Sequence, residues 1–100
     1  MRERIRIDGA PLSEADFAHF FWEVWERLGE NPTRKLESTP LRPVYFRFMT
    51  ILALHAFISL NASATILEVG IGGLYDSTNI VPEPVVTGVS ALGIDHTFVL

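Results

Sequence analysis

Apolar and charged residues alternate at the start of the chain. Ile5 and Ile7 fall on one face of an extended segment, and Arg4 and Arg6 fall on the other. A period of two residues predicts a half-buried strand, and the Asp-Gly pair that follows it predicts a turn. The chain is therefore expected to open with a short strand that ends in a tight turn.

The period changes to a helical one in "PLSEADFAHFFWEVWERLGE", residues 11 to 30. Ser13 and Asp16 resemble a helix-capping pair, and Gly29 suits the end of a helix. The apolar positions of this segment recur at intervals of three and four residues: Phe17, Phe20, Phe21, Val24, Trp25 and Leu28. Such spacing predicts an amphipathic helix with one aromatic face.

A second helix is predicted after the proline-rich loop of residues 31 to 43. Pro43 suits the first turn of this helix, which is expected to run to about Leu60. The helix is apolar almost all round, so it should be covered on several sides. It contains Arg47 and His55 and is shorter than the roughly 20 residues of a membrane span, so we predict a buried helix and no membrane span.

Two short apolar runs follow, "ATILEV" (residues 64–69) and "VVTGVS" (residues 85–90). Both are rich in β-forming residues and predict parallel strands that are buried on both faces. Strands alternating with helices indicate an α/β fold with a parallel sheet and flanking helices. Residues 1–100 show no internal boundary. Three strands make an incomplete sheet, so this domain is expected to pack against parts that the chain lacks.

Composition narrows the classes of function. The net charge is −4 and no cluster of lysine and arginine is present, which argues against a nucleic-acid partner. The absence of cysteine excludes disulfides and cysteine-ligated zinc. Hydrophobic residues make up 48% of the chain, which is high for so short a domain and again predicts surfaces that pack against missing parts.

The candidate chemistry lies where the two predicted strands end, because ligands of open parallel sheets bind beyond the carboxyl ends of strands. Glu68 closes the first strand, and Asp95 and His96 follow the second. Glu68 is either a magnesium ligand or a carboxylate bonded to the backbone amides of the next loop. His96 is a metal ligand, an acid–base group or a capped loop histidine. If the strands are near neighbours, Glu68 and His96 share one crevice.

A glycine-rich loop, residues 70 to 79, separates these two positions. Gly70, Gly72 and Gly73 either let the backbone approach a ligand or simply make a tight turn. The four polar residues that follow could orient a phosphate or a metal-bound water, or they could be ordinary turn formers; they are Asp76, Ser77, Thr78 and Asn79. Neither G-x-x-x-x-G-K-[ST] nor G-x-G-x-x-G is present.

Four stretches together resemble the folylpolyglutamate synthase family of the Mur ligase superfamily, in order and over nearly the whole chain. They are "RERIRIDGAPLSEADFAHFFWEVWERL", "RPVYFRFMTILALHAF", "ILEVGIGGLYDSTNIV" and "VVTGVSALGIDHT". The pattern of EVGIGG-x-x-D-x-TN followed by LG-x-DHT is the specific part. "LYDSTN" looks like the eukaryotic synthases, although Leu74 stands where many relatives have a charged or small residue.

The resemblance implies an ATP-dependent amide ligase with the central-domain fold of Mur ligases, a P-loop-type parallel sheet. Such enzymes phosphorylate the γ-carboxylate of a folate with Mg²⁺ and ATP, and L-glutamate then attacks the acyl phosphate. The positions matching the family's magnesium ligands are Glu68 and His96. Gly70, Gly72, Gly73, Asp76 and Asn79 are the candidates for cofactor binding. No catalytic residue is assigned, and the family implies the cytosol or mitochondria.

Several parts of the family pattern are missing, and these departures shape the expectation. The phosphate-binding Gly-Thr-x-Gly-Lys-Gly-Ser run, a carbamoylated lysine and the glutamate-binding C-terminal domain are not in this sequence. The chain is therefore expected to be a central piece of the ATP-binding domain, inactive alone. Two alternatives remain open: a piece of dihydrofolate synthase, or a non-catalytic product that binds a partner through the aromatic face of residues 17–28.

Overall fold

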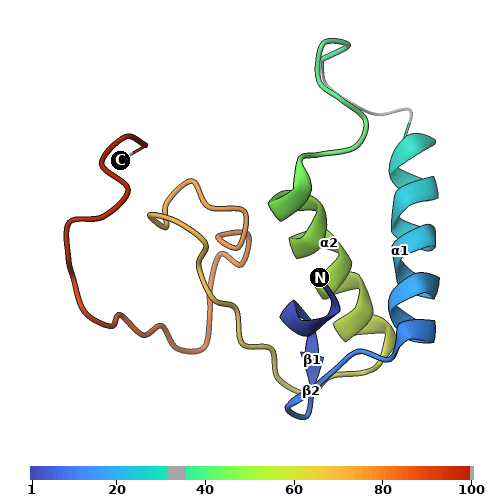
Figure 1. The fold of residues 1–100 in the computed structure, drawn as a ribbon, viewed down its shortest axis with the longest axis horizontal. Helices are drawn as coiled ribbons and strands as arrows, with labels where there is room; N and C mark the ends of the chain where they lie inside the picture. Colours follow the sequence, from blue (N-terminus) through green and yellow to red (C-terminus); the bar gives the residue numbers. More distant parts are fainter. Residues whose placement is uncertain (32–35, 100) are drawn as a thin grey trace. The chain divides into compact units, whose positions relative to one another are not determined.

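The computed structural model describes residues 1–31 and 36–99. Contacts divide the chain into two units, Met1–Ile66 and Leu67–Leu100, and each is described by itself. The regular elements of the described residues all lie in the first unit (Figure 1). In chain order they are the 3₁₀ turn η1 (Arg2–Arg4), the strands β1 (Arg6–Ile7) and β2 (Ala10–Pro11), and the helices α1 (Glu14–Gly29) and α2 (Tyr45–Ser59).

The chain opens with a small antiparallel hairpin, in which Arg6 pairs with Pro11 and Ile7 with Ala10. Its turn residues Asp8 and Gly9 have φ angles of 51° and 81°. Two positive φ angles in a two-residue loop match the right-handed twist of hairpin strands, which is why Asp-Gly suits this turn. The predicted strand and turn are confirmed, and Ile5 just before β1 is buried as the alternation predicts.

Helix α1 begins and ends where the sequence predicts. The Ser13 hydroxyl accepts a 3.0 Å hydrogen bond from the Asp16 amide, so one of the amides at the helix start has a partner. Gly29 is the last helical residue, but its φ is not positive. The usual reason for a glycine at this point, a left-handed residue just after the helix, therefore does not apply here.

At Gly29 the side chain of Arg42 instead fills the space where a side chain would lie. A Cβ added to Gly29 would lie 2.8 Å from the guanidinium carbon of Arg42, closer than real Cβ atoms approach other atoms. The guanidinium stacks over the Trp25 ring at 4.3 Å, and its Nε donates a 3.0 Å hydrogen bond to the Trp25 carbonyl. Arg42 thus packs against the last turns of α1 through a cation–π contact and a hydrogen bond to a helix carbonyl.

Helix α2 starts at Tyr45, so Pro43 lies just before the N-cap residue Val44 and not in the first turn as expected. Thr50 is buried, and its hydroxyl donates a 3.0 Å hydrogen bond to the Phe46 carbonyl one turn earlier. Among the described residues, no helix has both the length and the apolar run that crossing a bilayer requires.

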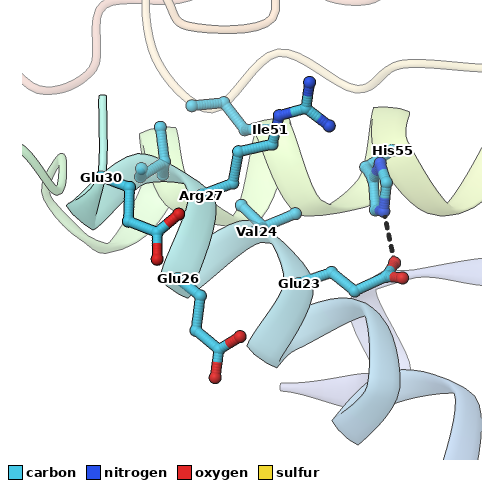
Figure 2. Close-up of a pocket in the computed structure, with 8 residues that line it drawn as sticks. Glu23, Val24, Glu26, Arg27, Glu30, Ile51 and His55 are labelled. Atoms are coloured by element: carbon cyan, nitrogen blue, oxygen red, sulfur yellow. Dashed lines mark hydrogen bonds and ion pairs between the residues drawn. The ribbon is translucent and has the colours of Figure 1, made fainter. Parts of the chain in front are cut away.

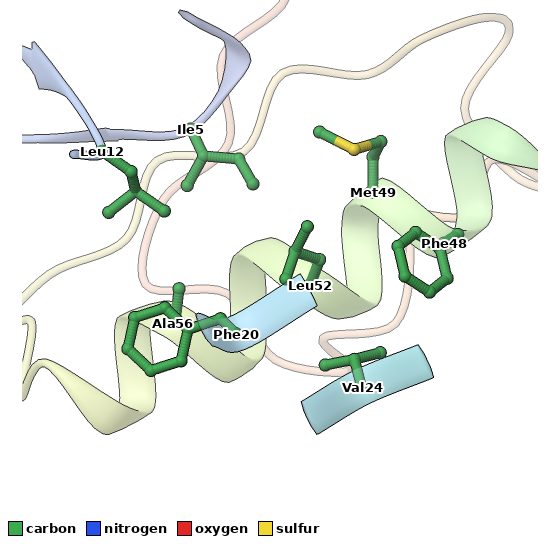
Figure 3. Packing of buried hydrophobic residues seen from close by; sticks show 8 residues of the cluster. All are labelled: Ile5, Leu12, Phe20, Val24, Phe48, Met49, Leu52 and Ala56. Carbon is green, nitrogen blue, oxygen red and sulfur yellow. The ribbon is translucent and has the colours of Figure 1, made fainter. Parts of the chain in front are cut away.

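The core of the first unit forms where α2 meets α1 and the hairpin (Figure 3). Leu52 and Ala56 are completely buried. The buried cluster draws on all three elements and the segments beside them: Ile5, Leu12, Phe20, Val24, Phe48, Met49, Leu52 and Ala56. One side of α2 is covered, but Ile58 near its end is 77% exposed, so the expectation of cover on several sides is met only in part.

The aromatic face of residues 17–28 packs within the first unit. Phe21 stacks on Trp25, with ring centroids 5.8 Å apart, and both rings meet Phe48 of α2 edge-on. Trp22 is the exception, at 56% exposure. The alternative of a non-catalytic product that binds a partner through this face requires the face to be exposed. Because α2 covers it, that observation no longer favours the alternative.

A polar contact also joins the two helices at the edge of the core (Figure 2). Nε2 of His55 lies 2.8 Å from the Glu23 carboxylate, whose other oxygen is 3.3 Å from His19 on the same helix. The His55 ring meets Phe20 edge-on at 5.6 Å. The hydrogen bond with His55 lowers the pKa of Glu23, and the nearby His19 adds to this against the opposing effect of desolvation. His19 and His55 thus take part in surface and packing contacts.

The predicted strands at residues 64–69 and 85–90 have no regular secondary structure, which corrects that expectation. Within the described residues the sheet consists of β1 and β2, which are antiparallel, so this small fold is compatible with an α/β class but contains no parallel sheet. A parallel strand is stable only when neighbouring strands bond its amides and helices cover both its faces. Ile66 and Val85, one from each run, illustrate the consequence, since both are fully or almost fully exposed.

Truncating the centre of the core should destabilise the first unit strongly. We expect Leu52→Ala to lower the free energy of unfolding by about 2–5 kcal/mol, because it removes buried contacts and leaves a cavity. Urea unfolding followed by helical circular dichroism measures this. Ile58→Ala, on the same helix but exposed, is the matched control and should change stability by less than about 0.5 kcal/mol. Equal effects of the two variants would contradict the assigned core.

The contact between Glu23 and His55 should make the helix pair sensitive to acid. The pKa of Glu23 lies below its ordinary 4.5, so the stabilisation is complete above pH 4.5 and is lost as the pH falls through the lower, folded-state value. We expect the melting temperature of the natural chain to exceed that of Glu23→Gln near neutral pH, with the gap closing in acid. A gap that stays constant between about pH 7 and about pH 3 would contradict this assignment.

Candidate functional site

The glycine loop of the second unit is organised around the carboxylate of Asp76. One oxygen accepts hydrogen bonds from the amides of Gly70 (3.1 Å) and Ile71 (3.0 Å). The other accepts the amide of Thr78 at 2.9 Å and its hydroxyl at 2.7 Å. One side chain therefore ties the start of the loop to its end.

Backbone bonds close the same loop from within. The amide of Asp76 donates to the carbonyl of Gly73 at 3.1 Å, and the amide of Asn79 donates to the carbonyl of Asp76 at 3.0 Å. The Asn79 side chain donates to the carbonyl of Leu74, also at 3.0 Å. Residues 70 to 79 thus form a compact series of turns held by hydrogen bonds.

Two of the three glycines are required by the path of the backbone. Gly72 and Gly73 have φ angles of 70° and 144°, which other residues adopt rarely. A Cβ on Gly73 would meet no atom within 4 Å, so conformation and not space demands glycine there. Gly70 has no positive φ and contributes its amide to Asp76. The turn-forming role of the loop is thus observed, and a role in binding ATP stays a prediction.

The bonds around Asp76 stabilise its charged form. Partial burial alone would raise the pKa of this carboxyl, but the hydrogen bonds from Thr78, Ile71 and Gly70 together hold the pKa below its ordinary 3.8. Asp76 is therefore ionised at neutral pH. The sequence left open whether Glu68 bonds the backbone amides of the glycine loop. In the structure, the acid that bonds these amides is Asp76 and not Glu68.

Glu68 lies two residues before the tied amides, and its side chain is exposed. His96 has a φ of 48°, and its amide donates a 2.7 Å hydrogen bond to the Asp95 carboxylate. The imidazole Nε2 is 3.8 Å from that carboxylate, and the ring meets Phe98 edge-on at 6.0 Å. The ring nitrogen and the carboxylate are beyond hydrogen-bond distance, so the close carboxylate partner that is common beside metal-binding histidines is not formed here.

The two predicted metal ligands are not brought into contact. No ion pair joins Glu68 to His96 in the described part of the chain, and no group of three or more His, Cys, Asp or Glu side chains there could hold a metal ion. Mg²⁺ usually takes one or two carboxylates and completes its shell with phosphate oxygens and water. An exposed glutamate at the start of a braced loop fits that requirement, while an imidazole is a less usual partner.

Sequence reasoning did not single out the bracing role of Asp76. A signal for it was present, because Asp followed two residues later by Thr is a common arrangement for a side chain that bonds the backbone amide two residues on. The longer reach back to Gly70 and Ile71 had no such signal, since it depends on how the glycines turn. The contact between Glu23 and His55 also had no local signal in the sequence, because it joins residues of two different helices.

The geometry defines a class of site: a glycine loop braced by an ionised aspartate, with an exposed carboxylate at its start that suits an oxygen-ligated cation. Comparison with known proteins is more specific. The whole chain matches a folylpolyglutamate synthase of Candida albicans with 47% identity over 106 residues, which is 21% of that protein. Folylpolyglutamate synthases of Saccharomyces cerevisiae strains YJM789 and RM11-1a match with 50% identity over 105 residues, or 19% of their length.

These matches confirm the resemblance that the motifs indicate. Over its whole length, the chain is similar to a segment of folylpolyglutamate synthase, and it spans about a fifth of the length of the curated relatives it matches. No family model matches the chain. No solved structure matches it either.

The bracing of the loop can be tested by nuclear magnetic resonance as the pH is lowered. We expect the amide signals of Gly70, Ile71 and Thr78 to shift together with one midpoint below 3.8, because one carboxylate accepts all three amides. The amide of Gly88, in an exposed segment outside the loop, serves as the control and should not follow this transition. Three different midpoints, or a common midpoint above 3.8, would show that Asp76 does not brace the loop.

Proposed function

We propose that the chain works as part of an ATP-dependent ligase that adds L-glutamate to the γ-carboxylate of tetrahydrofolate and its polyglutamates. The observation that carries this proposal is the match of the whole chain, at 47–50% identity, to proteins named folylpolyglutamate synthase. The substrates are then a folate, L-glutamate and ATP. Cytosol and mitochondria are the compartments that the resemblance implies.

The reaction would proceed through an acyl phosphate. The γ-phosphoryl group of ATP passes to a carboxylate oxygen of the folate, which leaves ADP and a mixed anhydride. The amine of L-glutamate then attacks the carbonyl carbon, phosphate leaves, the nitrogen loses a proton, and an amide bond forms. Mg²⁺, when bound, would offset the charge that develops on the phosphate oxygens.

Within this scheme, Glu68 and His96 are the residues of this chain that would hold Mg²⁺. Removing a carboxylate from water without a partner costs free energy. A divalent cation bound to Glu68 would offset that cost. Gly70, Gly72 and Gly73, with Asn79, would shape the backbone beside the nucleotide. The catalytic base and the phosphate-binding loop are not assigned to this chain.

The exposed apolar residues of the second unit support a place inside a larger domain. Val85, Val86 and Ile94 of this unit, and Ile66 at the end of the first unit, are more than four-fifths exposed, an unusual state for such residues in a finished domain. In the whole enzyme we propose that residues 64–69 and 85–90 become strands of a P-loop-type parallel sheet, as in the central domain of Mur ligases. Packing against the rest of that domain would cover these residues, and the isolated chain is expected to be inactive.

Dihydrofolate synthase remains the alternative, since it would use the same chemistry on a different acceptor. Assaying a full-length enzyme that contains this segment with dihydropteroate and with tetrahydrofolate separates the two. Glutamate addition to tetrahydrofolate alone supports the proposed function, and addition to dihydropteroate alone supports the alternative.

The magnesium assignment gives a sharper test in the same full-length enzyme. We expect Glu68→Gln to lower ligase turnover by at least about 100-fold while part of the ATP affinity is kept, because the variant keeps the size of the side chain but loses the charge that faces the metal. Glu83→Gln, which changes another exposed acid of the second unit, is the matched control and should keep full turnover. Unchanged turnover in Glu68→Gln would overturn the metal assignment.

A further inference from the structure

The carboxylate of Asp76 has no capacity left for a ligand. An ionised carboxylate accepts about four hydrogen bonds through its two oxygens. Four donors already take these places: the amides of Gly70, Ile71 and Thr78, and the Thr78 hydroxyl. A metal ion or a ribose hydroxyl could reach Asp76 only if one of these bonds broke. Asp76 is thus poorly suited to the direct cofactor contact considered from the sequence.

The bonds to Gly70 and Ile71 instead fix the backbone that carries Glu68. Two successive amides that point at one anion form a concave arrangement which holds both peptide planes in place. The peptide bond is rigid, so an amide fixed at Gly70 also fixes the Cα atom of Val69. Only the φ and ψ angles of Val69 then separate the held backbone from the peptide plane that carries the Glu68 Cα atom.

We propose that Asp76 is a positioning residue for Glu68, which it aims through the backbone of residues 69–71 without touching metal or substrate. This inference rests on the proposed function, because it takes Glu68 to be the magnesium ligand. The same carboxylate bonds Thr78, so it also keeps the far end of the loop closed. In other metal sites, hydrogen-bond partners orient the ligand side chains directly. Asp76 orients Glu68 through the main chain instead.

The variant that tests this is Asp76→Asn in a full-length enzyme that contains the segment. Asparagine keeps the size of aspartate but turns one acceptor into a donor, which would face either the amides of Gly70 and Ile71 or Thr78. We expect the Mg²⁺ concentration for half-maximal turnover to rise about tenfold or more, with most of the turnover restored at saturating Mg²⁺. Glu68→Gln differs, because its turnover should stay low at any Mg²⁺ concentration.

A second variant and a structural readout keep the test decisive if Asp76→Asn folds poorly. Thr78→Val keeps the shape and the amide of residue 78 but removes its hydroxyl, so it should raise the Mg²⁺ requirement in the same direction by a smaller factor. The amide signals of Gly70 and Ile71, recorded in each variant, report whether the brace is broken. Glu83→Gln is the control for loss of an acid elsewhere in the second unit.

The outcomes separate this inference from the proposed function. If Asp76→Asn shifts the Gly70 and Ile71 signals and leaves the Mg²⁺ requirement unchanged, the brace exists but does not position Glu68, and the inference is overturned. If Asp76→Asn loses turnover at every Mg²⁺ concentration, as Glu68→Gln should, Asp76 acts directly and the inference again fails. Full turnover in Glu68→Gln would overturn the metal assignment itself, whatever Asp76→Asn does.

Discussion

The burial of one side of α2 is the interaction on which the first unit depends. Leu52 and Ala56 have no exposed surface, and they meet α1 on one side and the hairpin segment on the other. Without α2, the aromatic face of α1 and the apolar residues Ile5 and Leu12 would all face water. Polar contacts such as the one between Glu23 and His55 lie at the edge of this core. Exposed contacts of this kind add little stability and mainly help to align the two helices.

The second unit is held together in a different way. None of its described residues belongs to the buried cluster, and its glycine loop is shaped by hydrogen bonds that converge on Asp76. Hydrogen bonds exchange with water at small net gain, so an arrangement of this kind defines a local shape without supplying much stability.

The sequence predicts best what depends on neighbours along the chain. The cap at Ser13, the face of α1 and the Asp-Gly turn each follow from residues within four positions of one another, and all three are confirmed. The start of α2 was misplaced at Pro43, because proline is tolerated both in a first turn and just before a cap.

Features that depend on distant partners could not be predicted from local pattern. The runs at residues 64–69 and 85–90 have the composition of buried strands, but a strand also needs neighbours, and composition cannot supply them. One acid, Glu68, precedes the glycine loop and another, Asp76, lies within it, and nothing in the sequence says which of them bonds the amides of Gly70 and Ile71. That choice follows from the turn at Gly72 and Gly73, which only the folded backbone reveals.

The fit between Gly29 and Arg42 has a consequence for how this segment can vary. Alanine normally favours a helix over glycine by about 1 kcal/mol, yet a methyl group at position 29 would occupy the place of the guanidinium. A side chain at position 29 would therefore displace the end of Arg42 and cost its stacking and hydrogen bond with Trp25.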